Sequence, residues 1–226
     1  MQEQPSLARR AATEALGSMM LAATVIGSGI MAERLAGGNT AVALLANTAA
    51  TVAVLAALIA LLGPISGAHF NPVVSVMELL RRRLAAADSA VYVVVQAIGC
   101  GAGAVLAHAM FELPLLQTST HVRTGSAQWL AEAVATFGLQ FVVIGHRRSA
   151  DAPWMVAAWS GAAYWFTAST SFANPAITVA RCLTNTFAGI RPADVVGFVV
   201  AQCVGATISV IVARWLFSAS RAPQRS

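Results

Sequence analysis

Long apolar runs constrain this chain more than any other feature of its sequence. An α-helix needs about 20 residues, at about 1.5 Å per residue, to cross a bilayer. Six runs approach that length, at residues 11–31, 40–62, 90–110, 127–145, 153–169 and 193–217. Only 10% of the residues are charged, against about 25% in a soluble domain. The sequence therefore predicts an all-α membrane protein with six transmembrane helices.

Two further apolar stretches, residues 69–80 and 174–183, are too short to cross a membrane. Each covers about half of the bilayer, so each is expected to form a re-entrant half-helix. Irregular backbone at membrane depth occurs only where it is buried in protein or lines a wet cavity. The two stretches therefore predict a pore or a substrate site.

The basic residues predict the orientation in the membrane. All of them are Arg, and they lie between the apolar runs rather than along one amphipathic face, which argues against nucleic acid as a partner. An even number of spans places both termini on one side. That side would hold Arg9, Arg10, Arg81, Arg82, Arg83, Arg147, Arg148, Arg214, Arg221 and Arg225, and the other side Arg34, Arg123, Arg181 and Arg191. Positive charge collects inside, so both termini are predicted to be cytoplasmic, in the plasma (inner) membrane. The two half-helices then enter from opposite faces.

The second half of the chain repeats the first. The order Glu, Asn-Pro, Gln occurs at Glu14, Asn71-Pro72 and Gln96, and again at Glu132, Asn174-Pro175 and Gln202. We expect one domain, residues 1–226, with repeats at about 8–112 and 124–218. Each repeat has three spans, an odd number, so the repeats are inverted. Inverted repeats with broken helices place the solute path at their interface.

The segment SGAHFNPV, which ends at Val73, and the tripeptide Asn174, Pro175, Ala176 carry a resemblance to a known family. They resemble the paired Asn-Pro-Ala signatures of the major intrinsic proteins, the aquaporins and aquaglyceroporins, with Val73 in place of the first Ala. The resemblance extends from about Glu14 to Gln202. It implies a passive channel for small uncharged solutes and a homotetramer with one pore per subunit. Neither a cofactor nor a metal site is expected, since Cys100, Cys182 and Cys203 have no metal-ligand spacing.

The same resemblance implies roles for the paired signatures. Asn71 and Asn174 would cap the half-helices, with Pro72 and Pro175 in the first turn, which agrees with local preferences. Two positive helix ends would then face each other at the pore centre. The free Asn amides would donate to a passing oxygen and exclude ions, as described for aquaporin-type pores.

Other polar residues at membrane depth have two interpretations each. Glu14 and Glu132 resemble structural acceptors for backbone donors of the half-helix loops, but they could also form the proton relay of a coupled transporter. Gln96 and Gln202 are expected to be interior hydrogen-bond partners. The resemblance implies that His69 lines the pore; the alternative is a packing histidine that bonds a loop carbonyl.

The sequence departs from the family after the second signature. Most members have an Arg there, and this chain has Ile177. In the family that Arg forms the outer selectivity filter with an aromatic residue from span two and two further positions. Counting back from the two Asn residues places these positions at Thr51, Ala162 and Ser171 in this chain. This predicted filter contains no aromatic ring and no cation, so it is expected to be wide.

Arg181 follows Ile177 by four residues. Four residues turn an α-helix by about 400°, so Arg181 is expected on nearly the same face, about 6 Å further out. One hypothesis is that it places a positive charge in the extracellular vestibule. The alternative is an interfacial Arg that snorkels to headgroups or pairs with Asp194.

Together these features predict a passive channel for water and for glycerol-sized polyols, urea or neutral metalloid hydroxides such as arsenous acid (arsenite). The alternatives are a water-selective aquaporin, a proton-coupled transporter that uses Glu14 or Glu132, and a scaffold that transports nothing. An enzyme is not expected. Its only candidate constellation, Ser66 or Ser171 with His69, lacks an orienting group.

Overall fold

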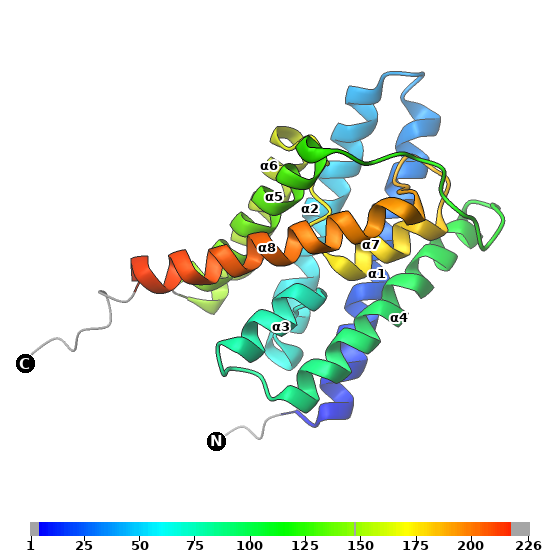
Figure 1. Ribbon diagram of the computed structural model, residues 1–226. Helices are drawn as coiled ribbons and strands as arrows, with labels where there is room; N and C mark the ends of the chain where they lie inside the picture. The colour runs from blue at the N-terminus through cyan, green and yellow to red at the C-terminus, as the bar shows by residue number, and fades with distance from the viewer. Residues whose placement is uncertain (1–4, 147, 218–226) are drawn as a thin grey trace, which may run out of the picture.

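The computed structural model describes residues 5–146 and 148–217, which form a bundle of helices (Figure 1). The elements are α1 (Leu7–Leu35), α2 (Thr40–Ser66), α3 (Pro72–Leu80), α4 (Ala86–Met110), α5 (Ser126–Gly145), η1 (Ser149–Asp151), α6 (Ala152–Phe166), α7 (Pro175–Ala180), η2 (Arg181–Leu183) and α8 (Pro192–Phe217). Within these residues no strand is formed. The all-α prediction is confirmed.

The long helices correspond to the apolar runs of the sequence. Within the described residues, five helices are long and apolar enough to cross a membrane: α1, α2, α4, α5 and α8. The remaining predicted span, residues 153–169, forms α6, which has 15 residues and packs along α2. Its helix ends at Phe166, earlier than the apolar run suggested.

The two predicted half-helices are α3 and α7, and each begins at the proline of an Asn-Pro pair. The Asn71 Oδ1 atom accepts a hydrogen bond from the Val73 backbone N–H at 3.1 Å. The Asn174 Oδ1 atom accepts one from the Ala176 backbone N–H at 3.0 Å. Both half-helices therefore start with an Asn cap and a proline in the first turn, as local preferences dictate.

Both repeats use the same close helix contact. Helix α1 packs along α4, and α5 packs along α8. A Cβ atom on Gly99 would lie 2.3 Å from the carbonyl oxygen of Ala15. In the second repeat, a Cβ atom on Gly205 would lie 2.1 Å from the carbonyl oxygen of Ala133. Glycine is required at both positions because the helix backbones touch there.

Two ends of the bundle can be distinguished (Figure 1). At the first, which we call the terminal end, α1 and α4 begin, and α3 and α8 end. An Arg10–Asp88 ion pair at 2.8 Å and a hydrogen bond of 3.3 Å from Arg214 Nη2 to the Leu80 carbonyl hold these segments together. At the opposite end, which we call the loop end, Arg34 Nη2 donates to the carbonyl oxygen of Phe111, across the ends of α1 and α4.

Candidate solute pathway

A cavity of about 320 Å³ lies between the two repeats. Part of its polar lining comes from the two half-helix loops and includes Asn71 and Asn174. At the terminal end it is lined by His69, Glu78, Arg83 and His146, and at the loop end by Thr51, Tyr164, Ser171, Phe172, Ile177 and Arg181. Aliphatic side chains complete the wall: Leu21, Val25, Leu55, Ile59, Val74, Leu139, Val143 and Val156.

The half-helix loops are joined by two crossed hydrogen bonds. The Asn71 Nδ2 atom donates to the carbonyl oxygen of Ala173, and the Asn174 Nδ2 atom donates to that of Phe70, both at 2.8 Å. A primary amide has two N–H groups. The amides are therefore less free than the resemblance implied. Each has one N–H engaged by the other repeat and one N–H that remains for a solute oxygen.

Glu14 holds the first loop from behind. Its carboxylate accepts hydrogen bonds from the His69 and Phe70 backbone N–H groups, at 2.9 and 2.7 Å. The Ser66 hydroxyl donates to it at 2.6 Å, and the Gln96 side chain at 2.8 Å. The carboxylate is fully buried and has four donors.

Glu132 holds the second loop in the same way. Its carboxylate accepts hydrogen bonds from the Phe172 and Ala173 backbone N–H groups, at 2.8 and 2.9 Å, and from the Gln202 side chain at 2.7 Å. The Gln202 amide also donates to the Thr178 hydroxyl at 2.9 Å. In the first repeat the Gln96 amide donates to Ser75 at 3.0 Å.

These carboxylates stabilise an unusual backbone. Ala68 and Phe70 have φ angles of 50° and 47°, and Ser171 and Ala173 have φ angles of 49° and 48°. Left-handed conformations of this kind cost non-glycine residues about 1–3 kcal/mol each. Glu14 and Glu132 are not among the described residues that line the cavity. Their position fits the interpretation of structural acceptors better than that of a proton relay.

His69 lines the cavity at the terminal side of the crossed Asn residues. Its Nδ1 atom is hydrogen-bonded to the Ser75 hydroxyl at 3.0 Å, rather than to a loop carbonyl, and its ring meets Tyr92 edge-on. The Ser66 hydroxyl donates to Glu14, so Ser66 and His69 each have another hydrogen-bond partner and do not form a catalytic pair.

At the loop end, three of the four predicted filter residues line the cavity: Thr51, Ser171 and Ile177. Ala162 does not, because it is exposed on the outer face of α6. Tyr164 takes its place, with its hydroxyl 3.4 Å from the Thr51 Oγ1 atom. The prediction of Ala162 is therefore wrong, and so is the prediction that this wall has no aromatic ring.

Arg181 lies in the cavity wall although it is only 3% exposed. Its guanidinium stacks on the Phe172 ring, 3.3 Å from the ring centroid, and its Nε atom donates to the Ala188 carbonyl. The alternative that paired Arg181 with Asp194 is wrong. Asp194 forms an ion pair of 2.8 Å with Arg191 and accepts the backbone N–H of Arg123.

Two further residues of this region, Arg123 and Phe172, belong to no motif of the sequence. The Arg123 guanidinium lies 5.1 Å from the Phe172 ring centroid and donates to the carbonyl oxygen of Gly189 at 2.8 Å. Burial lowers the pKa of Arg123, while the charge of Glu132 acts in the opposite direction. The repeat could have indicated Phe172, because it precedes Asn174 by two residues as His69 precedes Asn71.

The comparisons with known proteins agree with this arrangement. The family model described as "Major intrinsic protein" matches residues 1–154. The chain belongs to the major intrinsic protein family, and it is an integral membrane channel for small neutral solutes rather than an enzyme.

Among its relatives is the aquaglyceroporin AqpS of Rhizobium meliloti (strain 1021). The two are 52% identical over 219 residues, which cover 95% of this chain and 93% of the relative. The fold is similar to that of the X-ray structure of the aquaglyceroporin from Plasmodium falciparum. That match has a TM-score of 0.68 and 18% sequence identity, and covers 93% of this chain and 95% of the other.

Proposed function

We propose that the cavity conducts water together with glycerol-sized polyols, urea and neutral metalloid hydroxides such as arsenous acid. The observation that carries this proposal is the mixed lining of the cavity. Hydroxyl groups of Thr51, Tyr164 and Ser171 and the amides of Asn71 and Asn174 line it together with leucine, isoleucine and valine side chains. A polyol carries hydroxyl groups and C–H groups, so it can contact both kinds of lining.

Thr51, Ser171, Ile177 and Tyr164 form the filter in this proposal. Ile177 supplies neither charge nor hydrogen bonds, where an arginine would have held a solute hydroxyl and narrowed the passage. The hydroxyl groups of Thr51 and Tyr164 supply the polar contacts instead. Arg181 provides the positive charge of the loop-end vestibule, one helical turn from the position that the family uses.

Ion exclusion depends in this proposal on the crossed Asn residues. Their remaining N–H groups and the two half-helix N-termini all present positive partial charge to the cavity. A water molecule or an alcohol can accept these hydrogen bonds, and a cation cannot. Glu14, Glu132, Gln96 and Gln202 act by fixing the loops that carry Asn71 and Asn174.

We further propose a homotetramer in the plasma membrane with both termini in the cytoplasm. The orientation rests on the excess of arginines at the terminal end, where seven of the described arginines lie, against four at the loop end. Arg147, Arg221 and Arg225 lie outside the described residues. Large apolar side chains that are exposed on the single chain support contact with lipid or with neighbouring subunits, among them Ile98 at 66% and Val196 at 70% exposed.

The experiment is stopped-flow light scattering of proteoliposomes against water, glycerol, urea and arsenous acid in parallel. We expect flux above that of empty liposomes for all four solutes, following the solute gradient alone. Ile177→Trp should block the passage, whereas Val200→Trp, on the exposed face of α8, should not. Water flux without glycerol flux would support a water-selective aquaporin. Dependence on a pH gradient would support the coupled transporter, and no flux for any solute would contradict the proposal.

A further inference from the structure

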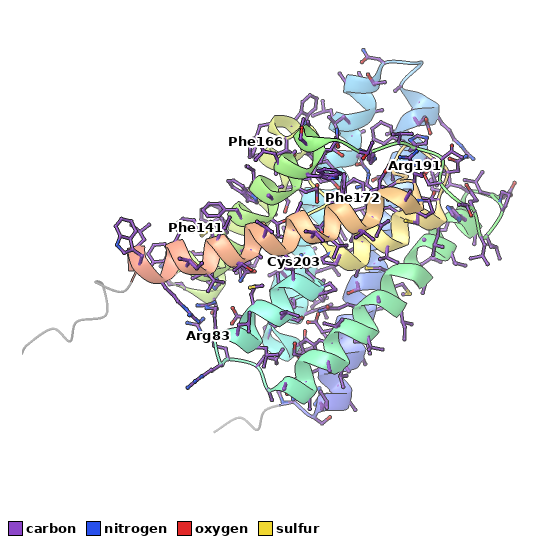
Figure 2. The ribbon with its side chains drawn as sticks, in the orientation of Figure 1. Arg83, Phe141, Phe166, Phe172, Arg191 and Cys203 are labelled. Carbon is purple, nitrogen blue, oxygen red and sulfur yellow. The ribbon has the colours of Figure 1, made fainter. Side chains whose placement is uncertain are left out.

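A second cavity, of about 380 Å³, lies at the terminal end of the bundle. Three arginines line it, Arg81, Arg83 and Arg214. Its other walls are apolar and come from α5 and α8: Ile144, Val210, Ala213 and Phe217. In Figure 2, Arg83 lies in the turn after α3, on the side of α3 toward the end of α8. None of the crossed Asn residues or filter residues belongs to this cavity.

The turn after α3 fixes the backbone from which two of these arginines project. The Arg82 N–H donates to the Leu79 carbonyl at 2.8 Å, and the Arg83 N–H donates to the Glu78 carbonyl at 2.9 Å. Arg82 itself has a φ of 60°. From the other side, Arg214 of α8 donates to the Leu80 carbonyl at 3.3 Å. The arginines are therefore gathered by the end of α3.

Positive charge in this cavity exceeds negative charge. Glu78 forms an ion pair with Arg81, and among the described residues no acidic side chain lines the cavity. An arginine guanidinium has five N–H donors in a fork that fits a phosphate group. Arg214 uses one of them on the Leu80 carbonyl, through its Nη2 atom.

The depth of the cavity is that of lipid headgroups. Arg214 lies in the last turn of α8, and the adjacent Trp215 is 78% exposed. Tryptophan at the end of a spanning helix is typical of the membrane–water interface. A ligand here would have its charged group beside the arginines and an apolar portion against Ile144 and Val210. A phospholipid has this form.

We propose that this cavity binds the phosphate group of an anionic phospholipid from the leaflet on the terminal side. Basic pockets between transmembrane helices bind such headgroups. Arg83 lines both this cavity and the solute pathway. A phosphate that engages Arg83 draws its guanidinium away from the mouth of the pathway, so the bound lipid increases solute flux. The binding site does not depend on the proposed solutes, whereas the effect on flux rests on the proposed function.

Binding is tested on the purified full-length chain by native mass spectrometry, with phosphatidylglycerol and phosphatidylcholine of equal acyl chains. We expect tighter binding of phosphatidylglycerol. Arg214→Gln should weaken it about fivefold, the usual effect of one arginine near an anionic headgroup. Arg82→Gln is the matched control, because Arg82 carries the same charge in the same turn but lines neither cavity. Its binding should stay within about twofold of the unmodified chain.

An equal loss of phosphatidylglycerol affinity in Arg82→Gln and Arg214→Gln would overturn the proposed site, because it would show a general attraction between surface arginines and anionic lipid. Displacement of phosphatidylglycerol by millimolar inorganic phosphate would show that the cavity binds a soluble phosphate, and would overturn the proposal of a lipid ligand. If Arg214→Gln elutes as aggregate in size exclusion, Arg83→Gln, which keeps the bond to Leu80, replaces it in the same titration.

The effect on flux is tested with glycerol in vesicles of phosphatidylcholine with and without phosphatidylglycerol. We expect about two- to threefold faster flux with the anionic lipid, a difference of less than 1 kcal/mol. Arg83→Gln should remove the difference, and Arg82→Gln should keep it. Lipid-independent flux in the unmodified chain would overturn the coupling. No glycerol flux in either vesicle would contradict the proposed function, and the binding experiment would still decide the site.

Discussion

The two repeats share a backbone frame and differ in the side chains that face the solute. In both, a buried glutamate holds a strained loop, a glutamine supports it, and an asparagine reaches across to the other loop. The residue two places before the Asn is His69 in one repeat and Phe172 in the other. The residue seven places after it is Glu78 in one and Arg181 in the other.

This difference gives the pathway unlike ends. The terminal end combines His69 and His146 with Glu78 and Arg83, and the loop end has Arg181 on an aromatic ring. The repeated frame thus determines the path of the backbone, whereas residues that differ between the repeats, among them Glu78 and Arg181, contribute to the charge that a solute meets at each end. The backbone path and the charge at each end can therefore be altered by separate mutations.

The largest expected effect comes from the glutamates of the frame. Glu14→Gln and Glu132→Gln each place an amide where N–H groups already converge, and each should lower the free energy of unfolding by about 3–5 kcal/mol. Glu14 accepts four hydrogen bonds and Glu132 three, so Glu14→Gln should be the more damaging. Thermal unfolding in detergent measures this. An unchanged free energy of unfolding in either variant would show that the two glutamates do not have the same structural role.

The glycines at the helix contacts test the frame at a smaller scale. Gly99→Ala and Gly205→Ala each push a methyl group into a carbonyl oxygen of the neighbouring helix, and should destabilise by about 1–3 kcal/mol. Gly101→Ala is the control, because no atom lies within 4 Å of its added methyl group. It should be neutral or slightly stabilising. We expect Gly99→Ala and Gly205→Ala to lower the thermal midpoint by similar amounts, and Gly101→Ala to leave it unchanged or slightly higher.

Ile177 tests the filter without disturbing the frame. Ile177→Arg adds a long cationic side chain to a wall that already holds Arg181, so glycerol flux should fall at least about tenfold, equivalent to about 1.4 kcal/mol in the barrier. Water flux should fall less, because water is smaller. The ratio of the two permeabilities in proteoliposomes is the measurement. Ile177→Leu, of equal volume, should leave this ratio unchanged.

The smallest expected effect is on cation leak, when the charged residue at one end of the pathway is neutralised. It allows a direct comparison of the two ends. Arg181→Gln should raise cation leak about fivefold, because a unit charge near the path contributes about 1 kcal/mol to the barrier. Glu78→Gln, at the equivalent position of the other repeat, should lower it or leave it unchanged. Conductance of planar bilayers measures both. Equal changes of the same sign would show that the ends are not electrically distinct.

Local rules were sufficient to predict the half-helices. Asn71-Pro72 and Asn174-Pro175 combine a good cap with a proline of suitable φ, so the starting residues of α3 and α7 could be located without tertiary information. The pairing of Glu14 and Glu132 with these loops was predicted from the resemblance. The number of donors that each carboxylate accepts depends on loop conformation and needed the structure.

The filter shows where counting along the sequence fails. Counting back from Asn174 to Ala162 crosses the end of α6 at Phe166, which the continuous apolar run does not reveal. Ala162 and Tyr164 differ by two residues, or about 200° around a helix, so this small difference places them on opposite faces. Thr51, reached by the same method, does line the cavity. The stacking of Arg181 on Phe172 depends on side-chain packing that the sequence pattern does not encode.

The crossed hydrogen bonds at the pore centre also affect the order in which the chain can be completed. The Phe70 carbonyl and one N–H of Asn71 find their partners at Asn174 and Ala173, about a hundred residues later in synthesis. Until those residues emerge, the first loop has unsatisfied polar groups at membrane depth, which cost several kcal/mol each. The first repeat on its own is therefore an unfinished folding unit. Arrival of the second Asn-Pro segment completes both repeats in one step.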